Sequence, residues 1–163
     1  NYTLMNFKMK TQLWALALLF VFFSCEDSGN ERPLGAYEIG VLIMNEGAFG
    51  TNDGEVYHWD PTKGEMKTDV FETENNRPFA GLLEDMVLEG GLMYLIANTG
   101  KVEIVNGGDF KSIGAVSSGL DQPRSLAVAE GKLFISDYGA YQPDFSTPNS
   151  YICLLYTSDA ADE

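Results

Sequence analysis

The chain has 163 residues, with 24 acidic and ten basic side chains that leave a net charge of −14. Such a field repels phosphate backbones, and no run of Lys or Arg interrupts it, so the sequence predicts no nucleic-acid partner. Of the two cysteines, Cys153 lies among the last eleven residues, which are not expected to belong to the natural sequence. Cys25 alone makes neither an internal disulfide nor a multi-cysteine zinc site.

The N-terminal region has the pattern of a secretory signal peptide. Lys8 and Lys10 precede an apolar run of eleven residues, Leu13 to Phe23, and Ser24-Cys25 follows at once. As a helix this run rises only about 16 Å, roughly half the hydrocarbon thickness of a bilayer, so no membrane span is expected. The junction resembles a bacterial lipobox, although Phe22 stands where Leu is usual. Residues 1–24 are therefore predicted to be a lipoprotein signal peptide with upstream residues, and ordinary cleavage near Ser24 is the alternative.

The resemblance to a lipobox implies that Cys25 is diacylated and anchors the mature chain in the outer membrane. Acyl chains gain about 0.8 kcal/mol per buried CH₂, and more than one chain gives stable anchoring. Residues 25–36 are predicted to be a flexible acidic tether. Its acidic pair, Glu26-Asp27, resembles the export signal of Bacteroidetes lipoproteins that face the cell exterior. The predicted location is thus the outer membrane, on its outer side.

Residues 37–152 alternate short apolar runs with glycine-rich turn signals, which predicts an all-β fold. Residues 86–98 align without a gap on residues 126–138, at an offset of 40. Val56–Asp60 corresponds more loosely to Val102–Asn106, at an offset of 46. A period of about 40 to 45 residues with several strands in each unit predicts a β-propeller, of which two to three blades are present.

Strand boundaries follow from the apolar runs. The unit with the clearest pattern is predicted to contain strands Asp85–Leu88, Met93–Ala97, Val102–Val105 and Ser112–Val116. The preceding unit is predicted to contain Val41–Asn45, Glu55–Trp59 and Met66–Phe71, and a third unit begins at Ser125. Because side chains alternate along a strand, we expect Trp59 in the core and His58 exposed on the opposite side.

Several segments between residues 38 and 140 carry a family resemblance. They are Val41–Gly47 with Gly50 and Asn52, the turn Asp60–Gly64, Glu84–Met86, Lys101–Val105 and Gln122–Val128. In these segments the chain resembles the YncE-like (YVTN-type repeat), seven-bladed propeller lipoproteins of Bacteroidetes cell surfaces. Some proteins similar to this group capture cobalamin and pass it to a TonB-dependent transporter. The resemblance implies a surface lipoprotein that captures a nutrient or cofactor, with such a transporter as partner.

One face of the propeller is predicted to carry the binding site. Loops from the second to the third strand of a unit, and loops entering the next unit, emerge on the same face and are mostly the longer ones. The ligand-binding candidates on these loops are Asn45, Glu46, Arg77, Asn98, Arg124, Asp137, Tyr138 and Tyr141. Two alternatives stay open. For Arg77 and Arg124, the alternative to ligand binding is an ion pair with a carboxylate of a neighbouring blade. For Tyr138, Tyr141 and Phe145, the alternative is packing within their own loop.

Catalytic motifs are missing from the sequence: there is no G-x-S-x-G elbow, H-E-x-x-H pair or phosphate loop. Asn45, Glu46, Asn52 and Asp53 lack the spacing of a calcium loop, so no metal site is predicted, and no motif identifies a cofactor. The favoured function is therefore non-enzymatic ligand binding. A metal-dependent propeller hydrolase or lactonase, and a structural or adhesion module, are the alternatives.

The last eleven residues, 153–163, read CLLYTSDAADE and match one reading frame of a transposase adapter used for sequencing libraries. We therefore expect the natural sequence to be informative only as far as Ile152. The chain is then expected to be an N-terminal fragment of a propeller with seven blades.

Overall fold

The structure is a computed structural model that describes residues 32–156. The predicted signal peptide and the lipidation site Cys25 lie outside the described residues, as does most of the tether. Within residues 32–156, no helix has the length and apolar character needed to cross a membrane.

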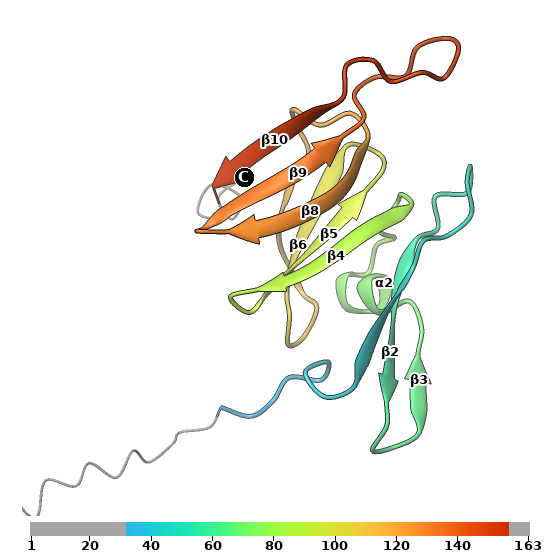
Figure 1. The fold of residues 1–163 in the computed structure, drawn as a ribbon. Helices are drawn as coiled ribbons and strands as arrows, with labels where there is room; N and C mark the ends of the chain where they lie inside the picture. The colour runs from blue at the N-terminus through green and yellow to red at the C-terminus, as the bar shows by residue number, and fades with distance from the viewer. Residues whose placement is uncertain (1–31, 157–163) are drawn as a thin grey trace, which may run out of the picture. The chain divides into compact units, whose positions relative to one another are not determined.

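The described chain forms three antiparallel sheets, in each of which neighbouring strands follow one another along the sequence (Figure 1). The first sheet contains β1 (Val41–Asn45), β2 (Glu55–Asp60) and β3 (Glu65–Lys67). The second contains β4 (Leu83–Glu89), β5 (Leu92–Ala97), β6 (Lys101–Asn106) and β7 (Ser112–Val116). The third contains β8 (Pro123–Ala129), β9 (Lys132–Asp137) and β10 (Tyr151–Tyr156). Successive meander sheets are the arrangement of propeller blades, so the predicted all-β, partial propeller is confirmed.

The second and third sheets repeat each other in detail at the predicted offset of 40. Val87 pairs with Tyr94 in the second sheet, and Ala127 pairs with Phe134 in the third. The ladder β4–β5 shifts register between residues 83 and 85, and the ladder β8–β9 shifts between residues 123 and 125. A bulge at the same place in two sheets is a property of the repeating unit.

The turns that follow these first strands also match. Gly90 and Gly91 have φ of 57° and 83°, and Glu130 and Gly131 have φ of 50° and 69°. Two successive positive φ angles are required by the two-residue hairpin whose twist suits antiparallel strands. Glycine meets this requirement without strain at three of the four positions.

Two apolar clusters hold the sheets together, and β5 contributes to both. Met93, Leu95 and Ala97 join a cluster that includes Tyr37 and, from the first sheet, the buried Val56. Tyr94 and Ile96, which alternate to the other face, join a cluster with residues of the third sheet. The second cluster contains Tyr94, Ile96, Val102, Ile104, Val116, Leu126, Leu133 and Ile135. The second sheet is therefore buried on both faces, which explains the continuous apolar sequence of β5.

The predicted strand Met66–Phe71 is wrong beyond Lys67, because a short helix, α2 (Val70–Asn75), follows β3. Asp69 precedes the helix at φ 54°, which ends the extended backbone. The carboxylate of Glu55, on β2, accepts hydrogen bonds from the backbone N–H groups of Phe71 and Glu72 at 3.1 and 2.7 Å. The first N–H groups of a helix have no partner within the helix and usually bond to a capping residue close by in the sequence. Here Glu55 of β2 takes that role.

The prediction that His58 is exposed is also wrong, since only 1% of its surface is accessible. Its Nε2 donates a hydrogen bond to the carbonyl of Ile39 at 2.7 Å, and the centres of the His58 and Tyr37 rings lie 5.3 Å apart in an edge-to-face contact. The segment before β1 thus covers this side of β2. Trp59, expected in the core, is only partly buried.

The predicted end of the natural sequence at Ile152 falls inside β10. This strand pairs with β9 over its whole length, and Cys153 and Leu155 pack against the second cluster. The segment alternates in the way a strand requires, so residues 153–156 extend the ladder.

Candidate functional site

Four aromatic side chains from two separate loops line a hollow of about 470 Å³, which we call the aromatic pocket. Phe49 comes from the loop 46–54 between β1 and β2. Tyr138, Tyr141 and Phe145 come from the loop 138–150 between β9 and β10, together with Thr147. Phe49 is 93% exposed and Phe145 is 83% exposed. The first and third sheets therefore contribute to one site.

The loop 46–54 is closed on itself and attached to the second sheet. The Asp53 carboxylate accepts hydrogen bonds from the Ala48 N–H and the Thr51 hydroxyl, at 2.7 and 2.8 Å. The carbonyl of Glu46 accepts from the N–H of Leu83, the first residue of β4, at 3.0 Å. These contacts fix the base of the loop and leave Phe49 at its tip. The loop between β1 and β2 thus lies beside the start of the second sheet. The sequence predicts this, because both kinds of loop are expected on the same face of the propeller.

The loop 138–150 is fixed at its base by Asp137. This buried carboxylate accepts hydrogen bonds from the N–H groups of Asp121 and Gln122, each at 2.9 Å, and of Gly139 at 2.7 Å. Farther out, the N–H of Phe145 donates to the Gln142 carbonyl at 2.9 Å in a tight turn. Asp137 therefore shapes the loop, and its carboxylate is occupied by backbone groups.

Arg124 lies beside the pocket and contacts two of its tyrosines. Its Nη2 donates to the Tyr141 hydroxyl at 2.8 Å, and its guanidinium lies 4.7 Å from the centre of the Tyr138 ring. Its Nη1 pairs with the carboxylate of Glu84 on β4. Burial raises the pKa of Glu84 above its usual range, against the opposing effect of Arg124, and the charge of Glu46 raises it further.

Three of the eight predicted binding residues are brought together here, namely Arg124, Tyr138 and Tyr141. A fourth, Glu46, acts through its charge on Glu84. Asn45 instead donates to the Tyr57 hydroxyl at 3.2 Å. Asn98 accepts from the N–H of Leu82 at 2.9 Å, within the second sheet.

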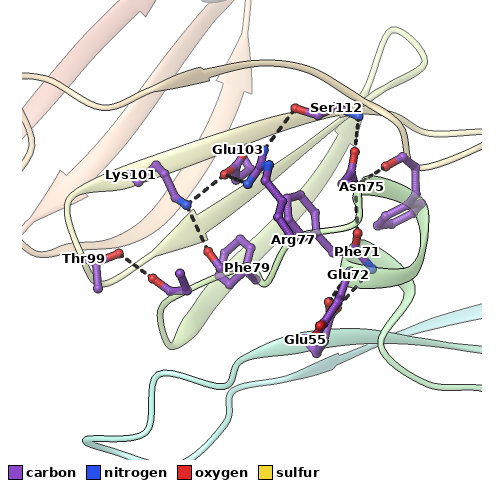
Figure 2. A network of polar contacts seen from close by, with 12 residues as sticks. Glu55, Phe71, Glu72, Asn75, Arg77, Phe79, Thr99, Lys101, Glu103 and Ser112 are labelled. Carbon is purple, nitrogen blue, oxygen red and sulfur yellow. Dashed lines mark hydrogen bonds and ion pairs between the residues drawn. The ribbon is translucent and has the colours of Figure 1, made fainter.

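Arg77 belongs to a different network, shown in Figure 2. Its Nη1 and Nη2 donate to the two carboxylate oxygens of Glu103 at 2.7 and 2.8 Å, and Lys101 reaches the same carboxylate at 2.8 Å. Lys101 also donates to the Phe79 carbonyl at 3.0 Å. Glu103 is 1% exposed; burial acts to raise its pKa, but the bonds from Arg77 and Lys101 bring it below its usual range. This network joins the segment after α2 to β6. Arg77 thus has a carboxylate partner, as the alternative expected, and so does Arg124 in its pair with Glu84 of the neighbouring sheet.

Two residues of the site were missed by the sequence prediction. Phe49 lies between glycines in the run Gly47–Gly50, outside any predicted strand. An aromatic residue in such a loop was the signal that could have identified it. Glu84 lies 40 residues before Arg124, so the two occupy equivalent positions of the repeat. The sequence shows that the two positions are equivalent, but it does not show that equivalent positions of neighbouring sheets contact each other.

A second hollow, of about 370 Å³, lies near α2, and its lining residues include Asp53, Glu55, Asp69 and Glu72. Burial raises the pKa of Glu55 above its usual range, although three backbone N–H groups bond to it and oppose the effect. Across residues 32–156, no group of three or more His, Cys, Asp or Glu side chains is placed to hold a metal ion.

No protein-family model matches the chain, and no curated protein matches it. Among solved structures, the chain is similar to the computationally designed Ika8 protein, with a TM-score of 0.46 and 8% identity over 67% of this chain and 29% of that one. It is also similar to BamB from Moraxella catarrhalis, with a TM-score of 0.41 and 18% identity over 61% of this chain and 27% of that one. The chain thus spans less than a third of either structure. The fold class rests on the three sheets of the chain itself.

Proposed function

We propose that this protein is a lipid-anchored surface protein that binds a small molecule in the aromatic pocket without transforming it. The observation that carries the proposal is the gathering of Phe49, Tyr138, Tyr141 and Phe145 around one hollow. Single exposed apolar residues are common, but aromatic side chains clustered on long loops of a rigid scaffold are typical of binding sites. Phe49 and Phe145 are too exposed for packing to explain their place.

The dimensions of the pocket suit a small organic molecule. Its volume of about 470 Å³ falls within the usual range of ligand sites, and its lining is mostly aromatic with few polar groups. The Tyr141 hydroxyl and Thr147 supply hydrogen-bonding groups to orient a ligand. Ring-bearing molecules gain both apolar burial and stacking on such a surface.

The sequence before the propeller supports the remaining part of the proposal. The basic and apolar segments before Cys25, and the acidic pair after it, support an anchor in the outer membrane that faces the exterior. A tethered binding protein at that location suits delivery of its ligand to a TonB-dependent transporter. The resemblance to surface propellers supports this partner.

The pocket is tested by measuring the binding of a panel of planar ring compounds to the purified full chain by isothermal titration calorimetry. We expect at least one compound to bind, and the double variant Phe49→Ala/Phe145→Ala to lose that binding by about tenfold or more. Both side chains are so exposed that folding should be unaffected. Phe134→Ala removes an aromatic ring outside the pocket and serves as the control. Binding that the double variant retains would contradict the proposal.

The anchor is tested separately by metabolic labelling with a fatty acid. The chain is expected to incorporate the label and to sediment with membranes, and Cys25→Ser is expected to lose both properties. Equal labelling of the two chains would exclude Cys25 as the acylated residue.

A further inference from the structure

We infer that the aromatic pocket selects a flat organic cation, an inference that rests on the proposed binding function. Four aromatic rings line the pocket, and the face of each ring is partially negative because the quadrupole of an aromatic ring concentrates electron density there. A cation held over such a face within about 6 Å is attracted, most strongly where water is displaced. None of the five lining residues carries a charge of its own.

Tyr138 already binds a cation of the protein in this way. The guanidinium of Arg124 lies 4.7 Å from the centre of the Tyr138 ring. The same contact occurs between Arg77 and Phe71 at 4.8 Å, in the network of the second sheet. Arg124 covers one face of the Tyr138 ring, and the ring still lines the pocket and is 44% exposed.

The charges around the pocket disfavour an anion. Arg124 is the cation that contacts the pocket tyrosines, and each of its two terminal nitrogens already has a partner, Glu84 for Nη1 and the Tyr141 hydroxyl for Nη2. Its remaining nitrogen, Nε, is buried without a hydrogen-bond partner, out of reach of a ligand. The charge of Arg124 is already paired with Glu84, so an anionic ligand would meet the charges of Glu84 and Glu46. The net charge of −14 adds to this repulsion.

The inference is tested with three fluorescent probes that share one flat frame. In slightly alkaline buffer, N-methylacridinium is a cation, acridine is neutral and acridine-9-carboxylate is an anion. Binding of each to the purified full chain is followed by fluorescence anisotropy. We expect the cation to bind about tenfold more tightly than the neutral probe and the anion to bind most weakly. The double variant Phe49→Ala/Phe145→Ala is expected to remove this preference.

The outcomes separate the inference from the proposed function. Equal affinity for all three probes, lost in the double variant, would overturn the cation preference and leave a ring-binding pocket. Tightest binding of the anion would overturn it in favour of Arg124 as an anion receptor. Failure of all three probes to bind would overturn both the inference and the pocket as a site for flat rings.

Glu84→Gln gives a sharper version of the same test. This change removes the charge that compensates Arg124, so we expect affinity for the cation to fall and affinity for the anion to rise. Glu89→Gln removes a charge from the exposed far end of the same strand and is the matched control. Unchanged probe preferences in Glu84→Gln would show that the Arg124–Glu84 pair does not set the selectivity, and would overturn the electrostatic argument.

Discussion

The second and third sheets are two copies of one unit used for different purposes. Both have the same bulge, the same turn and the same register at an offset of 40 residues. The second sheet is buried on both faces and has a three-residue turn, residues 98–100, between β5 and β6. The third has thirteen residues, 138–150, at the equivalent place between β9 and β10. The strands therefore provide the scaffold, and one lengthened loop supplies most of the aromatic pocket.

The units also contact each other through equivalent positions. Glu84 and Arg124, which are 40 residues apart, form an ion pair. The carboxylate of Asp85 accepts hydrogen bonds from the hydroxyl of Ser125, also 40 residues away, and from the N–H of Leu126. Different side chains at the same position of the repeat thus become partners across the interface between the two sheets.

The largest expected difference between the sheets concerns two aromatic residues at equivalent positions. Tyr94 is 1% exposed between the sheets, whereas Phe134 is 39% exposed on the outer face of the third sheet. We expect Tyr94→Ala to lower the free energy of unfolding by about 3–5 kcal/mol, and Phe134→Ala by less than about 1 kcal/mol. Denaturant unfolding followed by far-UV circular dichroism measures both. Equal effects would mean that the outer face of the third sheet is covered in solution.

Arg77→Ala should have the next largest effect, because it removes the bidentate partner of a buried carboxylate. Lys101 remains paired with Glu103, so we expect a loss of about 2 kcal/mol in the free energy of unfolding. Lys111→Ala breaks a longer, exposed ion pair with Asp109 and should change stability by less than about 0.5 kcal/mol. A loss in Arg77→Ala no greater than in this control would show that the network of Figure 2 contributes little.

Two buried carboxyl groups are expected to respond to pH in opposite directions. The pKa of Glu103 is lowered by Arg77 and Lys101, against its burial, so its contribution to stability is present above the usual carboxyl range and is lost on acidification. The pKa of Glu55 is raised by burial, so its contribution is present at low pH and is lost as the pH rises through that raised value. The stability difference between the parent chain and Glu103→Gln should therefore shrink on acidification, and the difference for Glu55→Gln should grow. Parallel pH profiles for the two variants would contradict these assignments.

Replacing residues 138–150 with Asn-Thr-Gly, the turn of the second sheet, should have the smallest effect on stability. The shorter loop lowers the entropy cost of closure, which offsets the lost loop contacts, so we expect a change within about 1 kcal/mol. Ligand binding should nevertheless disappear, because three of the four pocket rings are removed. Far-UV circular dichroism checks the fold and calorimetry checks binding. Binding that survives the replacement would place the site elsewhere.

The strands were predictable because their signals are local. The bounds of β1 and β7 agree with the prediction. Those of β5 differ by one residue at its start and those of β6 by one residue at each end, since apolar runs and the glycine turns that flank them are local signals. The helix α2 was missed because Glu55, fifteen or more residues away, caps it. His58 was misplaced because the side chain of Tyr37 covers it, a contact that strand periodicity does not encode.

The candidate site was also predictable in part, because the order of strands along the sequence is itself a local signal. Tyr138, Tyr141 and Arg124 follow from the order of strands in a blade, which places their loops on one face. Phe49 and Glu84 require knowledge of how neighbouring sheets approach each other. Sequence order predicts which loops share a face, but the lateral distance between sheets depends on core packing.

The position of Arg124 against Tyr138 makes the site one-sided. A planar ligand that stacks on this tyrosine has only the ring face that the guanidinium leaves free. The two faces of the bound molecule are then inequivalent, one against the protein and the other turned away. Even a ligand without any stereocentre is therefore held in a chiral setting, and a molecule with two distinct faces binds preferentially through one of them.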